Sequence, residues 1–438
     1  MPQIELQKLS KGNARSMNST KLKISIVGLG YIGLPTAAVL ASVGHKVLGI
    51  EVNQSIVEVV NRGEIHIVEP DLDGLVHAAV HSGRLRAALV AEQSDVFIIA
   101  VPTPFMNDHQ PDLRYIEQAA RAIAPQLRSG NLVILESTSP VGTTEKLAGW
   151  LAEERSDLRL PTIGSLDADV HVAYCPERVL PGSIVSELVR NDRVVGGLTP
   201  RCAEKARHVY ETFVRGQCIE TDARTAEMTK LTENAFRDVN IAFANEMSLI
   251  CDRLGINVWE LITLANRHPR VNILNPGPGV GGHCIAVDPW FIVDSAPDAA
   301  RLIRTAREVN DGKPQWVLSK VEEAVMEARS RHGRTVVVAC LGLAFKANID
   351  DLRESPALEI TRHLAERRIA DKLLVVEPYL DTLPRELAGR VGVELVEFDL
   401  ALAEADVVVL LVDHQDFKVV PRQSLDGKVV IDTRGQWR

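Results

Sequence analysis

The sequence lacks the features that mark secreted, membrane-spanning and nucleic-acid-binding proteins. Its 438 residues include only six cysteines, which are scattered and form no Cys-x-x-Cys pair, so a disulfide framework is not expected. No apolar run approaches the roughly 18 residues of a membrane span, and the polar residues 1–20 contain no apolar signal-peptide core. The net charge of −9 gives no general attraction to nucleic acid or anionic membranes. We therefore expect a soluble, cytoplasmic globular protein behind a disordered tail (residues 1–21).

The order of predicted strands and helices divides the chain into three parts. A chain of this length exceeds what one core normally supports, so two or three domains are expected. Residues 22–220 alternate strand and helix patterns, as a doubly wound α/β domain does, and residues 331–438 repeat that alternation. Residues 221–330 are expected to be mainly helical, with a long amphipathic helix from about Thr225 to Leu254 and an interruption at the glycine-proline segment 275–283. Strands are expected at 23–28, 46–51, 96–101, 132–136, 170–174 and 193–196, then at 335–341, 373–377, 407–411 and 429–431.

A dinucleotide-binding loop is predicted near the start of the first α/β part. A β-rich strand, Ile24–Val27, runs into the Gly-x-Gly-x-x-Gly pattern of Gly28–Gly33, and a small-residue helix follows. The glycines allow the backbone to approach a pyrophosphate, and the helix N-terminus contributes partial positive charge. Glu51, at the end of the next strand, would bind ribose hydroxyls and repel a 2′-phosphate, which favours NAD over NADP. FAD and a ligand-free tight turn are the alternatives.

Two further loops follow strands at the carboxyl edge of the same sheet, where such folds bind ligands. The first, Val101–Pro104, contains Thr103, and the second, Glu136–Gly142, contains Thr138. Each threonine can contact the cofactor or a water molecule. Each can equally well cap the N-terminus of a helix.

Cys284 is the candidate nucleophile of the chain. It lies two residues after the glycine-rich stretch 277–282, and Asp288 follows four residues later. A thiolate at a loop–helix junction has a lowered pKa and is a good nucleophile, although a small buried residue is the commoner fate of a cysteine. The neighbouring His283 is expected to project away from it, and Asp288 is either a water-orienting carboxylate or an ordinary surface residue. A nicotinamide site combined with such a thiol points to the oxidation of an alcohol through an aldehyde to an acid.

The long helix carries a second group of candidate site residues. Lys230 and Asn234 are four positions apart and therefore share a face, with Arg237 near it. A lysine on a helix is usually solvated, so this face matters only if it lines a cleft.

Five separate stretches resemble the UDP-glucose/GDP-mannose dehydrogenase family, in family order and over residues from about 22 to the C-terminus. Within that family, the sequence is most similar to the bacterial members that act on UDP-N-acetyl-D-mannosamine. The stretches are Ala173–Gly182, Lys230–Asn234, Asn266–Asn272, Gly281–Pro289, and Phe345–Lys346 with Asp351–Pro356.

The resemblance implies an N-terminal NAD domain, a central helix that builds a homodimer, and a C-terminal UDP-sugar domain. The implied reaction is the oxidation of a UDP-N-acetylhexosamine at C6 to a uronate, with two NAD per turnover. The product would serve bacterial surface polysaccharide synthesis. No metal is implied.

The resemblance also assigns roles to individual residues. Cys284 would be the nucleophile, Lys230 would stabilise oxyanions, and Asn234 and Asp288 would assist. Thr138 and Glu177 would position water. His268 and Arg270 would reach the site of the partner subunit. The remaining assignments are Gly28, Gly30, Tyr31, Ile32, Gly33, Glu51, Thr103, Thr138 and Arg353 for NAD, and Arg178, Val179, Lys230, Asn234, Arg237, Gly281, Phe345 and Lys346 for the UDP-sugar.

One departure from the family pattern concerns Pro181. The UDP-glucose members carry a second, catalytic glutamate at this position of the segment Glu177–Gly182. The proline therefore puts a glucose substrate in doubt and leaves the base of the hydrolytic step unassigned. The alternatives are a UDP-N-acetylglucosamine 6-dehydrogenase, a two-electron dehydrogenase of the β-hydroxyacid type, which needs neither Cys284 nor a second α/β domain, and a nucleotide-sugar sensor without enzymatic activity.

Overall fold

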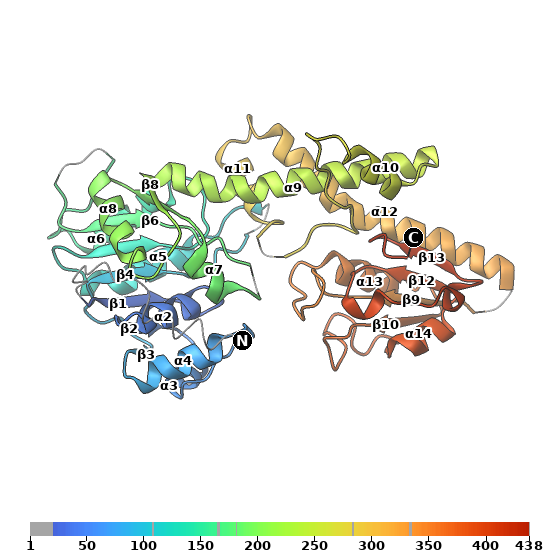
Figure 1. The fold of residues 1–438 in the computed structure, drawn as a ribbon, viewed down its shortest axis with the longest axis horizontal. Helices are drawn as coiled ribbons and strands as arrows, with labels where there is room; N and C mark the ends of the chain where they lie inside the picture. The colour runs from blue at the N-terminus through green and yellow to red at the C-terminus, as the bar shows by residue number, and fades with distance from the viewer. Residues whose placement is uncertain are drawn as a thin grey trace. The chain divides into compact units, whose positions relative to one another are not determined.

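The computed structural model describes residues 21–106, 109–163, 167–180, 182–282, 284–332 and 335–437. Residues 1–20 of the expected tail lie outside this range. The chain divides into two compact units (Figure 1). The N-terminal unit contains the described residues up to Pro104 together with Pro111–Lys230, and the C-terminal unit contains Phe105–Gln110 and Leu231–Arg438.

The N-terminal unit is built on an eight-stranded sheet with the strand order β3-β2-β1-β4-β5-β6-β7-β8. All neighbouring strands are parallel except β6 and β7. The chain reverses its direction of travel across the sheet between β1 and β4, and open α/β sheets bind ligands at the carboxyl ends of the strands at such a point. The strands are β1 (Lys23–Val27), β2 (Lys46–Ile50), β3 (Leu85–Ala88), β4 (Val96–Ile99), β5 (Leu132–Leu135), β6 (His171–Tyr174), β7 (Arg193–Gly197) and β8 (Cys218–Asp222).

Helices cover both faces of this sheet, so its central strands are apolar on both sides. In β4, Phe97 and Ile99 belong to one hydrophobic cluster, and Ile98, between them, belongs to the other. This double burial explains why the central strands read as continuous apolar runs. The helical elements are α2 (Gly33–Ser42), α3 (Gln54–Asn61), α4 (Leu72–His81), α5 (Arg114–Ile123), η2 (Ala124–Gln126), α6 (Thr143–Glu154), α7 (Ile184–Arg190) and α8 (Pro200–Tyr210).

Two long helices dominate the first half of the C-terminal unit. Helix α9 (Ala223–Leu254) begins in the N-terminal unit and confirms the long helix predicted at 225–254, and α12 (Arg301–His332) continues through Pro314. Between them lie α10 (Val258–Ala265) and α11 (Asp288–Ser295).

A buried polar network joins α9 to α12. Arg307 pairs with Asp238 at 2.7 Å, and both side chains are at most 2% exposed. The Asn310 amide donates to Asp238 Oδ1 at 2.8 Å and accepts from Asn245 at 2.9 Å. Asn245 in turn accepts the Gly277 N–H at 2.9 Å. The glycine-rich loop is therefore anchored to this helix pair.

The second sheet of the chain has the strand order β11-β10-β9-β12-β13 and is parallel throughout. One hydrophobic cluster packs α12 and α13 against one face, and a second cluster packs α14 against the other. The elements are β9 (Val337–Leu341), α13 (Pro356–Arg367), β10 (Lys372–Val376), β11 (Val393–Leu395), α14 (Phe398–Glu404), β12 (Val407–Leu410), η3 (Gln415–Phe417), η4 (Arg422–Leu425) and β13 (Val429–Asp432).

The predicted fold class is confirmed: an α/β domain of the dinucleotide-binding type, a helical region and a second α/β domain follow one another along the chain. The three domain boundaries given above stay a prediction. Strands β3, β8 and β11 were not predicted. All three lie at the edges of their sheets and are partly exposed, so their sequences lack a strong apolar pattern. Among the described residues, no helix is long and apolar enough to cross a membrane.

Candidate active site

The predicted dinucleotide loop has the geometry of a phosphate cradle. Gly28 has a φ of 91° and donates its N–H to the Ile50 carbonyl at 2.8 Å, which fixes the turn after β1. A Cβ on Gly33 would lie 1.8 Å from the Gly28 oxygen, so this glycine is required by packing. A Cβ on Gly30, in contrast, would meet no described atom within 4 Å. The protein itself thus gives no reason for a glycine there, whereas a pyrophosphate lying on the backbone would.

Glu51 lies beside this loop at the end of β2. Its Oε2 accepts the Leu29 N–H at 3.0 Å, and its Oε1 accepts the Asn53 N–H at 3.2 Å. Because the carboxylate is fixed but half-exposed, it can accept further hydrogen bonds from ribose hydroxyls. These residues fit NAD, which would be held by the loop, the start of α2 and Glu51. Tyr31 is 37% exposed and Ile32 directly precedes α2, and their contacts with NAD stay predictions.

His66, which was not predicted as a site residue, lies near Glu51. Burial lowers the pKa of His66 below 6.5, while Glu51 and a hydrogen bond to the Leu29 backbone oppose that shift. No motif marked this histidine, because its relation to the loop arises only from the fold.

The loops after β4 and β5 are tied to each other, as their position at one sheet edge suggested. The Thr103 hydroxyl donates to the Thr138 carbonyl at 2.5 Å, and the Ser137 hydroxyl donates to the Val101 carbonyl at 2.7 Å. Neither threonine caps a helix, because the residue before α5 is Leu113 and the residue before α6 is Gly142.

A buried carboxylate fixes the start of α9 to the second of these loops. Glu227 accepts hydrogen bonds from the Gly142 N–H at 2.6 Å, the Thr144 N–H at 2.8 Å and the Thr144 hydroxyl at 2.6 Å. Its side chain takes the place of a helix cap for α6. Lys230 is half-buried and follows Glu227 by three residues, so the helix turn that carries Lys230 is set by the contacts of Glu227.

Glu177, in the loop after β6, is 7% exposed and does not face bulk water. Its Oε2 accepts from Arg193 at 2.6 Å, and its Oε1 accepts the Arg178 N–H at 2.7 Å. Arg178 is half-buried, and Val179 packs on the hydrophobic cluster of this unit. Pro181 and His283, which enter the predictions from the sequence, lie outside the described residues.

In the C-terminal unit, the structure brings Cys284, Asp288 and Asn234 together. The Cys284 carbonyl accepts the Asp288 N–H at 2.8 Å, so the thiol-bearing turn leads directly into α11. Asp288 is the first residue of α11 and is 2% exposed, unlike an ordinary surface aspartate. The Asn234 amide donates to Asp288 Oδ2 at 2.5 Å. Cys284 itself is half-buried.

Close packing gives the glycines before Cys284 a role beyond the one predicted. A Cβ on Gly281 would lie 2.3 Å from the Glu354 carbonyl oxygen, and one on Gly282 would lie 2.9 Å from the Phe345 ring. The Gly282 N–H donates to the Arg353 carbonyl at 3.2 Å. The loop is thus pressed against the segment that contains Phe345, and larger residues would push the Cys284 turn away from it.

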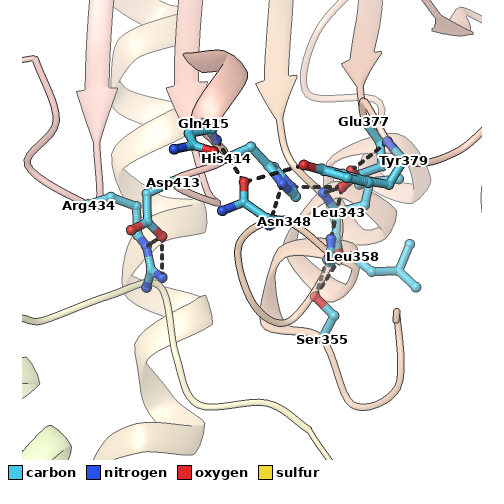
Figure 2. A network of polar contacts seen from close by, with 11 residues as sticks. Leu343, Asn348, Ser355, Leu358, Glu377, Tyr379, Asp413, His414, Gln415 and Arg434 are labelled. Atoms are coloured by element: carbon cyan, nitrogen blue, oxygen red, sulfur yellow. Dashed lines mark hydrogen bonds and ion pairs between the residues drawn. The ribbon is translucent and has the colours of Figure 1, made fainter. Parts of the chain in front are cut away.

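The turn after β9 repeats the design of the dinucleotide loop. Gly342 has a φ of 91°, and its N–H donates to the Val376 carbonyl at 2.8 Å. Glu377, at the end of β10, accepts the Leu343 N–H at 2.7 Å and the Ala344 N–H at 3.0 Å (Figure 2). These contacts match those of Gly28 with Ile50 and of Leu29 with Glu51, but Glu377 is only 4% exposed.

A buried histidine, His414, helps to shield Glu377 from solvent. Asn348 donates its N–H to His414 Nδ1 at 3.0 Å, so Nε2 carries the ring proton and donates to Glu377 at 3.2 Å (Figure 2). Burial by itself would raise the pKa of Glu377, but the hydrogen bonds from His414 and the Leu343 amide outweigh it and lower the pKa. The same contacts hold the loop that carries Phe345 and the exposed Lys346.

The other predicted substrate and cofactor residues of the C-terminal unit lie at its surface. Arg237 is exposed on α9, and His268 and Arg270 are exposed after α10, where the Arg270 N–H donates to His268 at 3.3 Å. Arg353 pairs with Asp351 at 2.6 Å. Their roles toward NAD, the sugar or a partner subunit stay predictions. Among the described residues, no group of three metal-ligating side chains is present.

Comparison with known proteins identifies the family of the chain. Three domain models of the UDP-glucose/GDP-mannose dehydrogenase family match it: the NAD binding domain at residues 22–214, the central domain at 224–312 and the UDP binding domain at 339–438. The chain belongs to this family. The resemblance noted in the sequence is therefore confirmed, and the N-terminal unit contains the family's NAD-binding domain.

Relatives of this dehydrogenase family member match along nearly its whole length. An NDP-N-acetyl-D-galactosaminuronic acid dehydrogenase of Ralstonia solanacearum is 63% identical over 94% of this chain and 96% of the relative. A UDP-N-acetyl-D-mannosamine dehydrogenase of Salmonella typhimurium is 59% identical over 95% and 99%. The solved structure of a UDP-D-ManNAc dehydrogenase from Pyrococcus horikoshii has a TM-score of 0.83 and is 38% identical, covering 95% of this chain and 96% of that one.

Replacing Glu51 by Gln should weaken discrimination against NADP. The fixed carboxylate repels a 2′-phosphate, and like charges placed this close cost enough to change a binding constant by at least ~10-fold. Titration calorimetry should show that the wild type prefers NAD strongly and that Glu51→Gln narrows the preference. Glu58→Gln, on the exposed face of α3, is the matched control and should change nothing. Equal affinity of the wild-type protein for both cofactors would contradict the assigned role of Glu51.

Proposed function

We propose that this chain oxidises C6 of UDP-N-acetyl-D-mannosamine to the carboxylate in two successive NAD-dependent steps. The arrangement of Cys284 with the buried Asp288, which Asn234 holds, carries this proposal. It places a thiol-bearing turn directly before a fixed carboxylate and amide, and a two-electron oxidation needs no such thiol. The family's NAD-binding and UDP-binding domains support the cofactor and the nucleotide part of the substrate.

In the proposed mechanism, Cys284 turns the aldehyde into a species that can be oxidised again. NAD would accept the hydride in both oxidations. A free aldehyde has no easily lost hydride until a nucleophile adds to it, so the Cys284 sulfur attacks C6 and forms a thiohemiacetal. Loss of the second hydride gives a thioester on Cys284, and water then breaks the carbon–sulfur bond and releases the uronate.

Lys230 would stabilise the oxyanion that develops at C6, because a cation aimed at a developing charge contributes more in the transition state than in the ground state. The contacts of Glu227 support this role, since they fix the helix turn of Lys230. Thr138 and Glu177 would position the hydrolytic water. Arg178, Lys346 and the loop at Gly281 would hold the nucleotide sugar.

The names of two relatives point to different sugars, and this supports a second candidate substrate. The Ralstonia relative is named for an N-acetyl-D-galactosaminuronic acid and the Salmonella relative for N-acetyl-D-mannosamine. Both names share the N-acetyl group, which agrees with the Glu177–Gly182 segment. An N-acetylgalactosamine-type substrate is therefore the second candidate, and UDP-N-acetylglucosamine remains the alternative that differs from the first candidate at C2.

A panel of UDP-sugars tests the substrate directly. NADH release should be much faster with UDP-N-acetylmannosamine than with UDP-glucose, and complete turnover should give two NADH per sugar. The panel should include the galacto and gluco N-acetyl sugars at the same concentrations. A clear preference for either of these, for UDP-glucose or for GDP-mannose would overturn the mannosamine assignment.

Removal of the Cys284 thiol tests the covalent mechanism. Cys284→Ala should lower uronate production at least ~10³-fold, the scale expected when a covalent nucleophile is deleted, while NAD binding is retained. Cys284→Ser should accumulate an ester, because an alkoxide leaves less readily than a thiolate, and mass spectrometry should find the sugar-nucleotide adduct at this residue. Cys218→Ala, in the edge strand β8, is the control. Near-normal yield of two NADH from Cys284→Ala would rule out the thioester.

We also infer a homodimer formed through α9. Phe236, Phe243 and Ile250 follow one another at intervals of seven residues and are 69%, 48% and 41% exposed. Seven residues are close to two helical turns, so these side chains form one apolar stripe on α9. A second copy of the chain would cover it and would bring His268 and Arg270 to the neighbouring site.

Phe243→Glu should therefore dissociate the dimer, since it places a charge in the apolar stripe. Sedimentation velocity should show a dimer for the wild type and for the exposed control Glu246→Gln, and a monomer with little activity for Phe243→Glu. A fully active wild-type monomer would refute the interface.

The activity itself would lie in the cytoplasm, as cell fractionation can test, and its product would serve a bacterial surface polysaccharide.

A further inference from the structure

A buried cluster of ionisable side chains lies behind the loops that follow β5 and β6. Glu136 directly follows β5, Arg193 lies on β7, and Tyr210 ends α8. Together with Cys175 and Glu177 they are between 0% and 7% exposed. One guanidinium is therefore enclosed with two carboxylates at the carboxyl edge of the sheet. Such a group is costly to bury, so it requires an explanation beyond packing.

The contacts within the cluster run from Glu136 to Glu177. The Tyr210 hydroxyl donates to Glu136 Oε1 at 2.7 Å. The Arg193 guanidinium lies 5.2 Å from the centre of the Tyr210 ring and donates to Glu177 Oε2 at 2.6 Å. Glu177 is thus held by a residue that itself packs on the tyrosine bound to Glu136.

The second carboxylate oxygen of Glu136 is the expected site of a proton. Glu136 Oε2 is buried and has no hydrogen-bond partner among the described residues, and a buried carboxylate oxygen left in this state favours the neutral acid. Burial raises the pKa of Glu136 to about 7; Arg193 opposes the shift, Glu177 adds to it, and the Tyr210 hydrogen bond opposes it. Burial also raises the pKa of Cys175 to about 12, so this thiol stays neutral.

We propose that Glu136, Tyr210 and Arg193 form a positioning network that fixes the Glu177 carboxylate for the water that hydrolyses the Cys284 thioester, with Glu136 holding an exchangeable proton. The inference rests on the proposed function and deepens it. In this step the water oxygen bonds to the thioester carbon and the carbon–sulfur bond breaks. The electron pair leaves with sulfur, and the water proton passes to Glu177 and then to the thiolate.

This network fixes the one carboxylate that remains in a segment that has lost its second. Pro181 replaces the second glutamate of the UDP-glucose members, so Glu177 is the carboxylate that remains between positions 177 and 182. While Glu136 is neutral, Arg193 pairs with Glu177 alone. When Glu136 ionises, two carboxylates compete for one guanidinium. Glu177 then loses its fixed position, and the hydrolysis rate declines as the pH rises through neutrality.

Glu136→Gln and Tyr210→Phe separate the network from a purely structural role. Glutamine keeps the shape and the neutral state of the acid, so its hydrolysis rate at pH 6 should stay within about threefold of wild type, and the decline near neutrality should vanish. Phenylalanine removes a hydrogen bond that lowers the Glu136 pKa, so the decline should move upward by about one pH unit. Glu204→Gln, half-buried and paired with Arg201 at 2.9 Å, and Tyr115→Phe, which is exposed, are the matched controls.

The measurement is the decay of acylated Cys284, followed by rapid quench and intact-protein mass spectrometry, after mixing enzyme with NAD and UDP-N-acetylmannosamine at pH 5.5–9. This range is about 1.5 to 2 pH units on either side of the expected transition. A decline that is absent in Glu136→Gln and displaced in Tyr210→Phe supports the network. An unchanged decline in both variants overturns it, even if both are less stable. If Glu136→Gln does not fold, the displacement in Tyr210→Phe decides alone.

A substrate-free measurement separates this inference from the proposed function. If the wild type forms neither acyl-enzyme nor NADH with any UDP-sugar of the panel, the proposed function fails. Infrared spectroscopy then follows the protonated carboxylic acid of Glu136 directly. The proton site is supported if this band disappears near neutral pH in the wild type, disappears at a higher pH in Tyr210→Phe, and is missing from Glu136→Gln. A wild-type protein without such a band overturns it.

Discussion

The buried pair of Asp238 and Arg307 is the constraint on which the C-terminal unit depends. Removing two charges from water is expensive, and here Asn310 helps to offset that cost by donating to Asp238. Four residues before Asp238 on the same helix, Asn234 binds Asp288. One face of α9 therefore secures both the long partner helix and the carboxylate next to the candidate nucleophile. A substitution that weakens this pair would therefore disturb the surroundings of Cys284, although no residue of the site itself is replaced.

Most of the fold was predictable because the buried elements carry strong patterns. The central strands β1, β4, β5 and β12 are short apolar runs buried on both faces, and such runs are visible without any knowledge of the partners. The edge strands were missed for the opposite reason. The sequence of β8, Cys-Ile-Glu-Thr-Asp, is partly exposed, and only its pairing with β7 makes it a strand.

The residues of the candidate site also fall into a predictable and an unpredictable group. Residues such as Cys284 and Lys230 could be predicted because they stand in short, recognisable stretches. The residues that hold the site in place were not, since their partners are distant in sequence: Tyr210 lies 74 residues from Glu136, and Thr144 lies 83 residues from Glu227. No local spacing encodes such pairs. They are specified by the sheet order, which brings successive strand ends to one edge.

The similar turns after β1 and β9 differ in a way that affects the exchange of the cofactor. Both turns end beside a strand-end glutamate, but Glu51 stays half-exposed whereas His414 seals Glu377 inside its domain. Of these two turns, only the first keeps a carboxylate that a ribose can reach. On the proposed function, both oxidations of one sugar then draw on the same loop in succession. The half-oxidised sugar would then have to stay bound while the cofactor is exchanged, and covalent attachment to Cys284 would prevent its loss.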